Sequence, residues 1–455
     1  MEKNTNLTEG NIVTTLLKFA FPFLLASLLQ ALYGAADLVI VGKFSNSASV
    51  SAVATGSQVM QTITGIVLGL TTGGTVLIGQ YLGGKKEADV AKTIGTMIYI
   101  FGIISVVLTL AMILLTGTIT NLMHTPTEAL VYTKHYIFTC STGIIFIVGY
   151  NVVSGILRGL GDSKSPLIFI ALACITNIIV DLILVGILNM GALGAAIATI
   201  SAQGISLILA ILFIKKKGFK FEFNKSHLKL NKEKAKKIFK LGLPIAMQDG
   251  LINISFLLIT TIINSMGVIA SASVGVVEKI IIFSMLVPTA FASSIAVIAA
   301  QNIGANKPER AKQSLYVGIF FSLIFGTIAC IYSNLNPSSI TSLFTTDQAV
   351  IQTASLFLKS YSIDCILVCF VFCMNSFFSG CGHSLFPMIH SLIATFLVRV
   401  PVSYALSKVN GITLYEIGFA APLATLLSLV ICLFYMKFGK WKENTLVEEN
   451  ISYDY

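Results

Sequence analysis

The stretch Gly159-Leu160-Gly161-Asp162-Ser163, with Pro166 shortly after it, decides the organisation of this chain because it occurs twice. Its counterpart is Gly380-Cys381-Gly382-His383-Ser384, again with a proline after it, at Pro387. The two copies are 221 residues apart, which is about half of the 455-residue chain. Two lobes of one fold are therefore predicted.

A second match has the same spacing. Gly83-Gly84-Lys85-Lys86 corresponds to Gly304-Ala305-Asn306-Lys307, and Gln80 corresponds to Gln301. The repeat thus extends beyond one turn and covers the ends of several predicted elements.

The composition indicates a membrane protein that crosses the bilayer many times. Hydrophobic residues make up 55% of the chain and charged residues only 11%, far from the usual balance of a soluble domain. A helix of about 20 apolar residues spans a bilayer. Twelve such stretches are predicted, at 12–42, 50–80, 91–115, 129–157, 164–187, 191–214, 239–264, 271–302, 312–334, 347–378, 385–407 and 412–437.

These spans predict an all-α protein with two parallel-repeat bundles of six helices. Six is an even number, so the second lobe begins on the same side of the membrane as the first. The predicted parts are a first lobe at 1–214, a basic cytoplasmic linker at 215–237, a second lobe at 238–437 and a cytoplasmic tail at 438–455.

The basic residues predict the orientation. Eleven lysines lie within 215–240, and the other loops on the same side are also basic, as cytoplasmic loops usually are. Both termini are therefore expected in the cytoplasm, with the protein in the cell membrane. The net charge of +10 is concentrated in these loops and does not indicate a nucleic-acid partner.

Two acids lie inside apolar spans, where an ionised side chain is costly and indicates function. Asp37 lies in the first span and Asp181 in the fifth. Each is about five residues, or roughly 8 Å, from the predicted outer end of its helix. Thr199 of the sixth span lies at a similar level, and Asn177 is one helical turn from Asp181.

Three helices thus offer carboxylate, amide and hydroxyl oxygens at one depth, and no basic residue of the first lobe lies there. Hard cations prefer oxygen ligands, and a proton needs a carboxylate with hydrogen-bond partners. We predict a site for H⁺ or Na⁺ at Asp37, Asn177, Asp181 and Thr199, with no other metal and no cofactor. Gln30 and Tyr33 share a helix face with Asp37 and are candidates for the substrate path.

The second lobe carries a different set of polar residues. Glu278 and Arg399 are predicted to form a salt bridge within that lobe, which would offset the burial of both charges. Gln248, Asp249 and Asp364 are further candidates for a substrate or polar network.

The combination resembles the MATE family, the multidrug and toxic compound extrusion transporters. The resemblance covers nearly the whole chain. It rests on the twelve spans and parallel halves, Asp37-Leu38-Val39-Ile40-Val41-Gly42, the Asn177 and Asp181 pair, the turn Arg158-Gly159-Leu160-Gly161-Asp162 and Gly83-Gly84-Lys85-Lys86.

The resemblance implies a V-shaped pair of bundles that exports amphipathic, cationic drugs in exchange for inward H⁺ or Na⁺. It also implies that Asp37, Asn177, Asp181 and Thr199 form the cation site. One branch of the family has acids in the seventh and tenth spans that serve sodium coupling. This chain departs from that branch, because the first of those positions falls near Ile252 and Asp249 and Asp364 lie about one turn away.

Two other functions compete with export. A related superfamily contains flippases for lipid-linked oligosaccharide precursors, but central acids favour a cationic cargo over phosphates. No phosphate-binding loop, zinc motif or nucleophile elbow indicates an enzyme. We expect a monomer in the lipid bilayer whose partners are small drug molecules.

Overall fold

A computed structural model describes residues 6–123, 125–219, 221–443 and 446. Parts of the predicted first lobe and tail, at 1–5, 444–445 and 447–455, lie outside the described residues. Every element of secondary structure in the described part is a helix. The predicted all-α class is confirmed.

The first half contains six spans, and five of them follow the predicted ranges within a few residues. The third, predicted to end at 115, continues to Leu122. The six spans are α1 Ile12–Phe44, α2 Ser47–Gly83, α3 Glu87–Leu122, the pair α4 Leu130–Thr142 and α5 Ile144–Gly159, α6 Lys164–Asp181 with the π-helix η1 Leu182–Ile187, and α7 Gly191–Lys217. A short 3₁₀ helix, η2 Lys225–His227, follows.

The second half repeats this order. Its elements are α8 Lys232–Asn264, α9 Val268–Gly304, α10 Pro308–Leu335, the short α11 Pro337–Thr341, the pair α12 Gln348–Tyr361 and α13 Asp364–Gly380, α14 Leu385–Ala394, the π-helix η3 Thr395–Arg399, α15 Val400–Ser407, α16 Leu414–Gly418 and α17 Ala420–Phe438.

In the described part of the chain, ten helices are long and apolar enough to cross a membrane. The α4–α5 pair is bent by 48° and the α12–α13 pair by 47°, and counting each pair as one span gives up to twelve. The bends occupy corresponding places in the two halves, since each pair leads into the repeated Gly-x-Gly turn. The predicted twelve-helix architecture fits.

The repeat also appears in the backbone. Gly161 has φ 88° and its counterpart Gly382 has φ 100°, a conformation that only glycine adopts readily. Lys85 and its counterpart Asn306 have φ 55° and 54°. These turns explain why the glycine motifs recur in the sequence.

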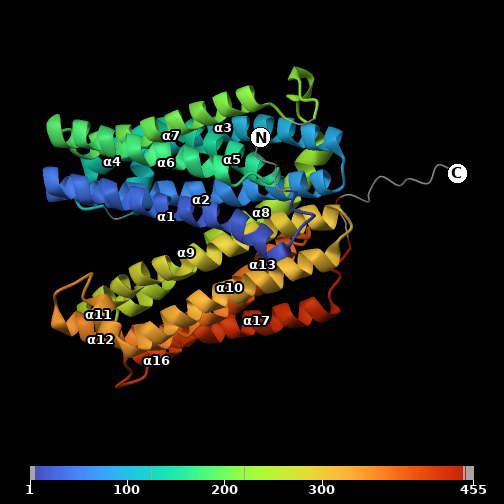
Figure 1. The fold of residues 1–455 in the computed structure, drawn as a ribbon. Coiled ribbons are helices and arrows are strands. Elements are labelled where there is room, and N and C mark those ends of the chain that lie inside the picture. Colours follow the sequence, from blue (N-terminus) through green and yellow to red (C-terminus); the bar gives the residue numbers. More distant parts are fainter. Residues whose placement is uncertain (1–5, 124, 220, 444–445, 447–455) are drawn as a thin grey trace. The chain divides into compact units, whose positions relative to one another are not determined.

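The contacts divide the chain into two compact units. Among the described residues, unit 1 contains those within 21–246, and unit 2 contains 6–20 and those from 247 onward. Helices α1 and α8 therefore belong to both units, each changing unit close to its internal proline, Pro22 or Pro244. Figure 1 shows the helices α2 to α7 of unit 1 and α9 to α17 of unit 2. The predicted lobe boundaries differ from these limits and stay predictions.

The first part of α8 lies tightly on α2 within unit 1. A Cβ atom on Gly73 would be 2.5 Å from the Gly242 nitrogen and from the Ile238 carbonyl oxygen. Lys234 is 2% exposed; its Nζ donates to Tyr81 Oη at 2.8 Å and lies 3.0 Å from Asp89 Oδ1. Several lysines predicted as linker thus form a helix that docks on this unit.

Unit 2 holds the start of the chain at the corresponding place. Asn302 Nδ2 donates to the Leu7 carbonyl at 3.1 Å. Arg310 donates to the carbonyl oxygens of Glu9 at 2.6 Å and Gly10 at 2.7 Å. Asn302 and Arg310 are the repeat counterparts of Tyr81 and Asp89. In each unit, therefore, the same two repeat positions bind a segment from the other half of the sequence, although the residue types at these positions differ.

Candidate functional site

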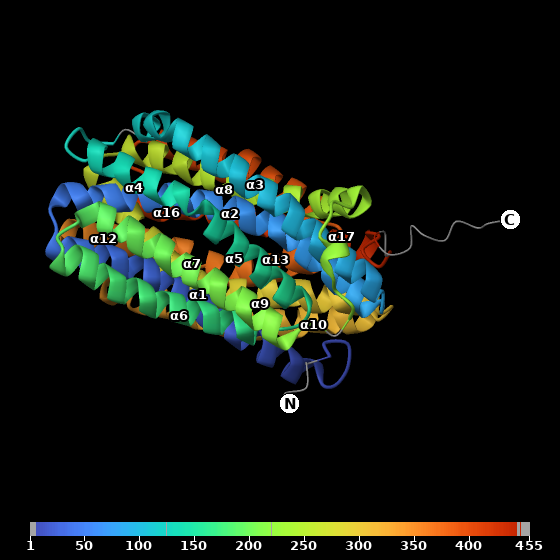
Figure 2. The ribbon, with the colours of Figure 1, turned by 90° about the horizontal axis from the view of Figure 1, so that it is seen from above.

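The candidate site of unit 1 is built by three helices. Asp37 lies on α1, Asp181 is the last residue of α6, and Thr199 lies on α7. Helices α6 and α7 run side by side in both views (Figures 1 and 2). Asn177 precedes Asp181 by one turn and therefore shares its helix face.

The structure brings these four side chains together. Thr199 Oγ1 donates a hydrogen bond to Asp37 Oδ2 at 3.1 Å. The Asp37 carboxyl group also interacts with the side chains of Asp181 and Asn177. Asp37 is 4% exposed, whereas Asn177 and Asp181 are fully buried. The depth estimated from the sequence is consistent with this proximity.

Most polar atoms of the group make no hydrogen bond of good geometry with the described residues. Among the described residues, Asp37 Oδ1, both Asp181 oxygens and both polar atoms of the Asn177 amide are buried without a hydrogen bond of good geometry. An unsatisfied buried polar atom costs about 1–3 kcal/mol. The arrangement therefore favours a species that the oxygens can bind, a proton or a small cation.

Electrostatics lead to the same conclusion. No lysine, arginine or histidine of the described part forms a salt bridge with Asp37 or Asp181, and each carboxyl group interacts with the other. Two carboxylates this close cannot both stay ionised without a compensating positive charge.

Helix α4 adds two residues that the sequence analysis did not single out. Tyr136, 1% exposed, and Cys140, also 1% exposed, lie in the electrostatic surroundings of Asp37 together with Tyr33. Tyr33, which shares a helix face with Asp37, also lies beside Thr199. The spacing of Tyr136 and Cys140 by four residues puts them on one face of α4, but only the fold shows which helix that face meets.

The helix carrying Asp181 changes its winding at this residue. The π-helix η1 begins immediately afterwards, and the amide of Leu188 bonds to the carbonyl of Ile183. Such π segments occur often at functional sites. By contrast, Gln30 of α1 is exposed, and no described contact joins it to Asp37.

The polar residues of unit 2 do not form one group. Gln248 Nε2 donates to Ser391 Oγ at 3.0 Å, Asp249 is exposed, and Asp364 is buried beside Thr425. The predicted salt bridge between Glu278 and Arg399 is wrong: no N–O distance between them within 4.0 Å occurs in the described part. Arg399 Nη2 instead donates a hydrogen bond to Tyr361 Oη at 3.1 Å.

The repeated turn has a structural role in unit 1. Asp162 accepts hydrogen bonds from the Ser165 amide at 2.9 Å and from Lys217 Nζ at 2.9 Å. Burial raises the pKa of Asp162, but these hydrogen bonds outweigh it and hold that pKa below its ordinary value. The turn therefore ties the start of α6 to the end of α7.

Comparison with known proteins identifies the family that the sequence motifs resemble, and the match covers most of the chain. A family model described as MatE matches residues 22–183 and again 244–405, which reproduces the internal repeat. The probable multidrug resistance protein YoeA of Bacillus subtilis is 26% identical over 94% of both chains. The multidrug export protein MepA of Staphylococcus haemolyticus is 25% identical over 89% of both.

Solved structures confirm the fold. An outward-facing multidrug resistance MATE family transporter of the MOP superfamily has a TM-score of 0.90 at 20% identity, covering 97% of this chain and 99% of that chain. A MOP superfamily transporter from Pyrococcus furiosus, described as having a binding pocket of reverse polarity, gives the same values. With its twelve candidate spans and its twice-matched family model, this chain belongs to the MatE family of multidrug and toxic compound extrusion transporters.

Proposed function

We propose that the protein is a secondary antiporter that exports amphipathic, cationic organic compounds in exchange for inward H⁺ or Na⁺. The coupling ion occupies the group formed by Asp37, Asn177, Asp181 and Thr199. The observation that carries the proposal is the buried pair of carboxylates without a basic partner in the described part of the chain.

The same pair supplies a mechanism. With the ion bound, part of the negative charge of the site is compensated and its helices can lie close together; without it, two negative charges repel each other and attract a cationic cargo. Coupling of this kind is reciprocal, so the cargo must lower the affinity for the ion as much as the ion lowers the affinity for the cargo. One site thereby links two opposite fluxes.

The basic loops support a position in the cell membrane with both termini in the cytoplasm. Efflux would then run from the side that carries the lysine-rich segment around 215–240. The site is formed by residues of one chain, which is consistent with a monomer as the transporting unit.

The proposal is tested by transport in inverted membrane vesicles. Uptake of a cationic dye is measured with a proton gradient alone and with a sodium gradient alone. We expect one of the two gradients to drive uptake, and Asp37→Asn to abolish it, because a neutral amide cannot exchange the ion.

The control is Glu128→Gln, which removes an exposed acid outside the site. Both variants must reach the membrane in amounts similar to the wild type. Wild-type transport by Asp37→Asn, or dye uptake that needs neither gradient, would refute the proposal.

A further inference from the structure

Gln203 of α7 is a polar residue at the edge of the candidate site in unit 1. It follows Thr199 by four residues, or about one helical turn, and therefore lies on the same helix face. Its Oε1 atom is buried, and it makes no hydrogen bond of good geometry with the described residues. The same holds for the Asn177 amide and for both Asp181 oxygens. Gln203 thus offers a buried oxygen that can still bind a ligand, as the site itself does.

Contacts on either side of Gln203 show where this helix face points. Thr199 Oγ1 donates to Asp37 Oδ2 of α1 at 3.1 Å. Ser206 Oγ donates to the Phe169 carbonyl oxygen of α6 at 3.1 Å. At 3.6 residues per turn, positions 199, 203 and 206 lie within about 60° of one another around the helix axis. Gln203 therefore points toward α1 and α6, into the interior of unit 1.

The Asn177 amide of α6 is the polar group that Gln203 approaches. Helices α6 and α7 are neighbours of opposite direction, because only η1 and a short turn join them. The Cα–Cβ bond of a helical residue tilts toward the N-terminus of its helix. Gln203 therefore leans toward the level of Thr199, and Asn177 leans away from Asp181. The two amide groups converge from opposite directions, on the side of the carboxylate pair that is nearer to Lys217.

An apolar cluster follows the two amides toward the end of α7 that carries the lysines 215–217. Phe169, Ile170 and Ala210 are buried in this cluster. Carboxyl groups, amide groups and apolar side chains therefore succeed one another toward the lysine-rich end. In the orientation proposed above, this end faces the cytoplasm. An ion that moves inward from the carboxylates consequently meets the amides first.

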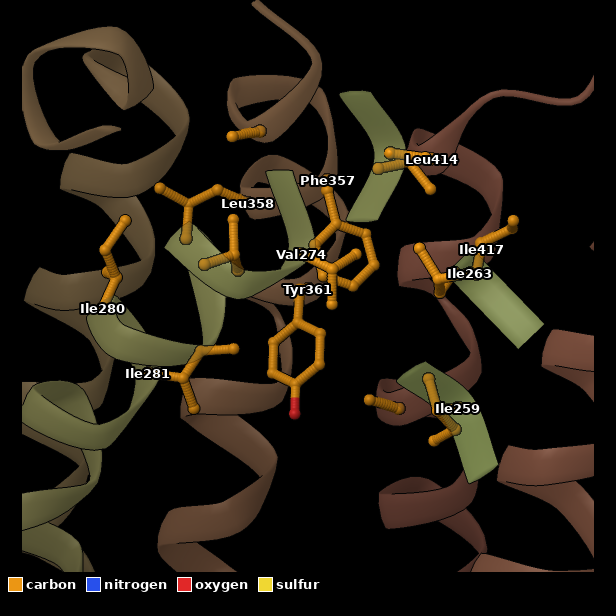
Figure 3. Close-up of a cluster of buried hydrophobic side chains, with 14 residues drawn as sticks. Ile259, Ile263, Val274, Ile280, Ile281, Phe357, Leu358, Tyr361, Leu414 and Ile417 are labelled. Carbon is orange, nitrogen blue, oxygen red and sulfur yellow. The ribbon is translucent and has the colours of Figure 1, made fainter. Parts of the chain in front are cut away.

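The second half of the chain shows that the helix arrangement does not require polar groups around such a site. Phe357 and Tyr361 of α12 are the counterparts of Tyr136 and Cys140, at the repeat spacing of 221 residues. Figure 3 shows both rings among aliphatic side chains, with Ile417 in the same cluster. The fold is thus stable with apolar packing at these places. A buried amide oxygen without a hydrogen bond is therefore better explained by what it binds than by packing.

We propose that Gln203 is a fifth residue of the ion site, and that Gln203 and Asn177 form the position through which the coupling ion leaves toward the cytoplasm. This inference rests on the proposed antiport function and deepens it. Amide oxygens can bind Na⁺ directly, and they can order a water molecule that carries a proton. Because an amide has no net charge, it attracts a cation less than a carboxylate does. The ion therefore resides at Asp37 and Asp181 and passes the amides during release.

The experiment measures the rate of dye uptake into inverted vesicles against the ion concentration inside them, with the gradient that drives the wild type. Gln203→Met keeps the length of the side chain and removes its polar groups. We expect the maximal rate to fall about tenfold, since one interaction with the moving charge is lost. The half-saturating ion concentration should not rise, because the carboxylates that capture the ion are intact.

Gln352→Met is the matched control, since it makes the same change at an exposed glutamine of α12 in unit 2. It should transport at the wild-type rate, and all variants must reach the membrane in similar amounts. An unchanged maximal rate in Gln203→Met, or a higher half-saturating ion concentration, would overturn the inference.

Gln203→Glu provides a second test that does not depend on how Gln203→Met folds. A carboxylate at this position should hold the cation on the cytoplasmic side. Ion added outside the inverted vesicles, at the cytoplasmic face, should then inhibit dye uptake at about tenfold lower concentration than in the wild type, which corresponds to one additional charge-assisted interaction. A residue that only supports packing would not change this concentration, so an unchanged value also contradicts the inference.

The two proposals fail differently. If a gradient drives dye uptake by the wild type but Gln203→Met keeps the maximal rate, the antiport proposal stands and the inner position falls. If neither gradient drives uptake by the wild type, the antiport proposal falls, and the inner position falls with it.

Discussion

Asp37 has one protein hydrogen bond of good geometry in the described part, the bond that it accepts from Thr199. The Thr199 hydroxyl group can act in two ways, which change the affinity for the coupling ion in opposite directions. As a donor it stabilises the ionised carboxylate and competes with a proton. As an oxygen ligand it helps to bind sodium. The residue therefore reports which ion is coupled.

We predict that Thr199→Val shifts half-maximal proton-driven transport to lower proton concentration, by up to about tenfold for one hydrogen bond to a charged group. If sodium is the coupling ion, the same change raises the sodium concentration needed. Titrating dye uptake against each ion measures the shift. Thr199→Ser keeps the hydroxyl and should behave as the wild type; an unshifted Thr199→Val would exclude a role for this bond.

A second residue-scale prediction concerns Asp162 and pH. Its folded-state pKa lies below the ordinary value, so its contribution to stability is present above that value, about 3.9, and is lost as the pH falls toward the folded-state pKa. Asp162→Asn should therefore lower the melting temperature in detergent at pH 7 and have a progressively smaller effect as the pH falls below about 3.9. A pH-independent difference would contradict this sign.

The acids of the site could be predicted from the sequence because they interrupt apolar spans. Asn177 and Thr199 followed from helical spacing and depth. Tyr136 and Cys140 could not, since aromatic and thiol groups are ordinary in apolar helices and only tertiary packing shows which ones meet the acids. The direct Glu278–Arg399 salt bridge failed for the same reason: equal depth does not fix a distance around the helix axes.

At the scale of elements, the contact between α2 and α8 depends on glycine. We predict that Gly73→Ala destabilises the protein by about 1–3 kcal/mol, because the added methyl group meets backbone atoms that cannot move aside. Gly102→Ala in α3 is the control, since nothing lies within 4 Å of its Cβ position. That change should be neutral or stabilising. Thermal melting in detergent measures both, and equal effects would refute the packing argument.

The buried Lys234 gives a further test of the same contact. Lys234 Nζ lies 3.0 Å from Asp89 Oδ1 and 3.5 Å from Glu233 Oε1. Asp89→Asn removes the closer of these two carboxylates and should destabilise the protein more than the double variant Asp89→Asn with Lys234→Met. The reason is that a buried ammonium left with the more distant carboxylate costs more than an apolar replacement of the lysine. Melting temperatures of the single and double variants decide; a double variant that melts below Asp89→Asn would contradict the prediction.

Most span limits could be read from hydropathy within a few residues. The exceptions have physical causes. Helix α8 begins at Lys232, earlier than predicted, because its lysines find Tyr81, Asp89 and Glu233 as partners. The breaks between α4 and α5 and between α12 and α13 do not interrupt the apolar pattern, so hydropathy alone does not reveal them.

At the scale of the whole molecule, each unit includes a segment from the other half of the sequence. We predict that the chain can be divided after Gly218, in the connection between α7 and η2, and that the co-expressed pieces restore dye export. Either piece alone should be degraded. The first lacks residues 232–246, and the second lacks residues 6–20.

Cellular abundance and dye efflux measure the result. A flexible insertion at the same position in the intact chain controls for disturbance of the loop. A second piece that is stable by itself would show that residues 6–20 contribute little to unit 2.

Each unit contains the first segment of the other half of the sequence, and this exchange bears on the origin of the protein. A single ancestral repeat could not have completed its own unit with its own first helix. That helix begins in one unit and continues into the other. Two copies of such an ancestor would have formed a domain-swapped pair, each completing the other. A single chain that contains both copies keeps this exchange within one molecule and allows the halves to differ: Asp181 of the first half corresponds to Val402 of the second, three residues from Arg399.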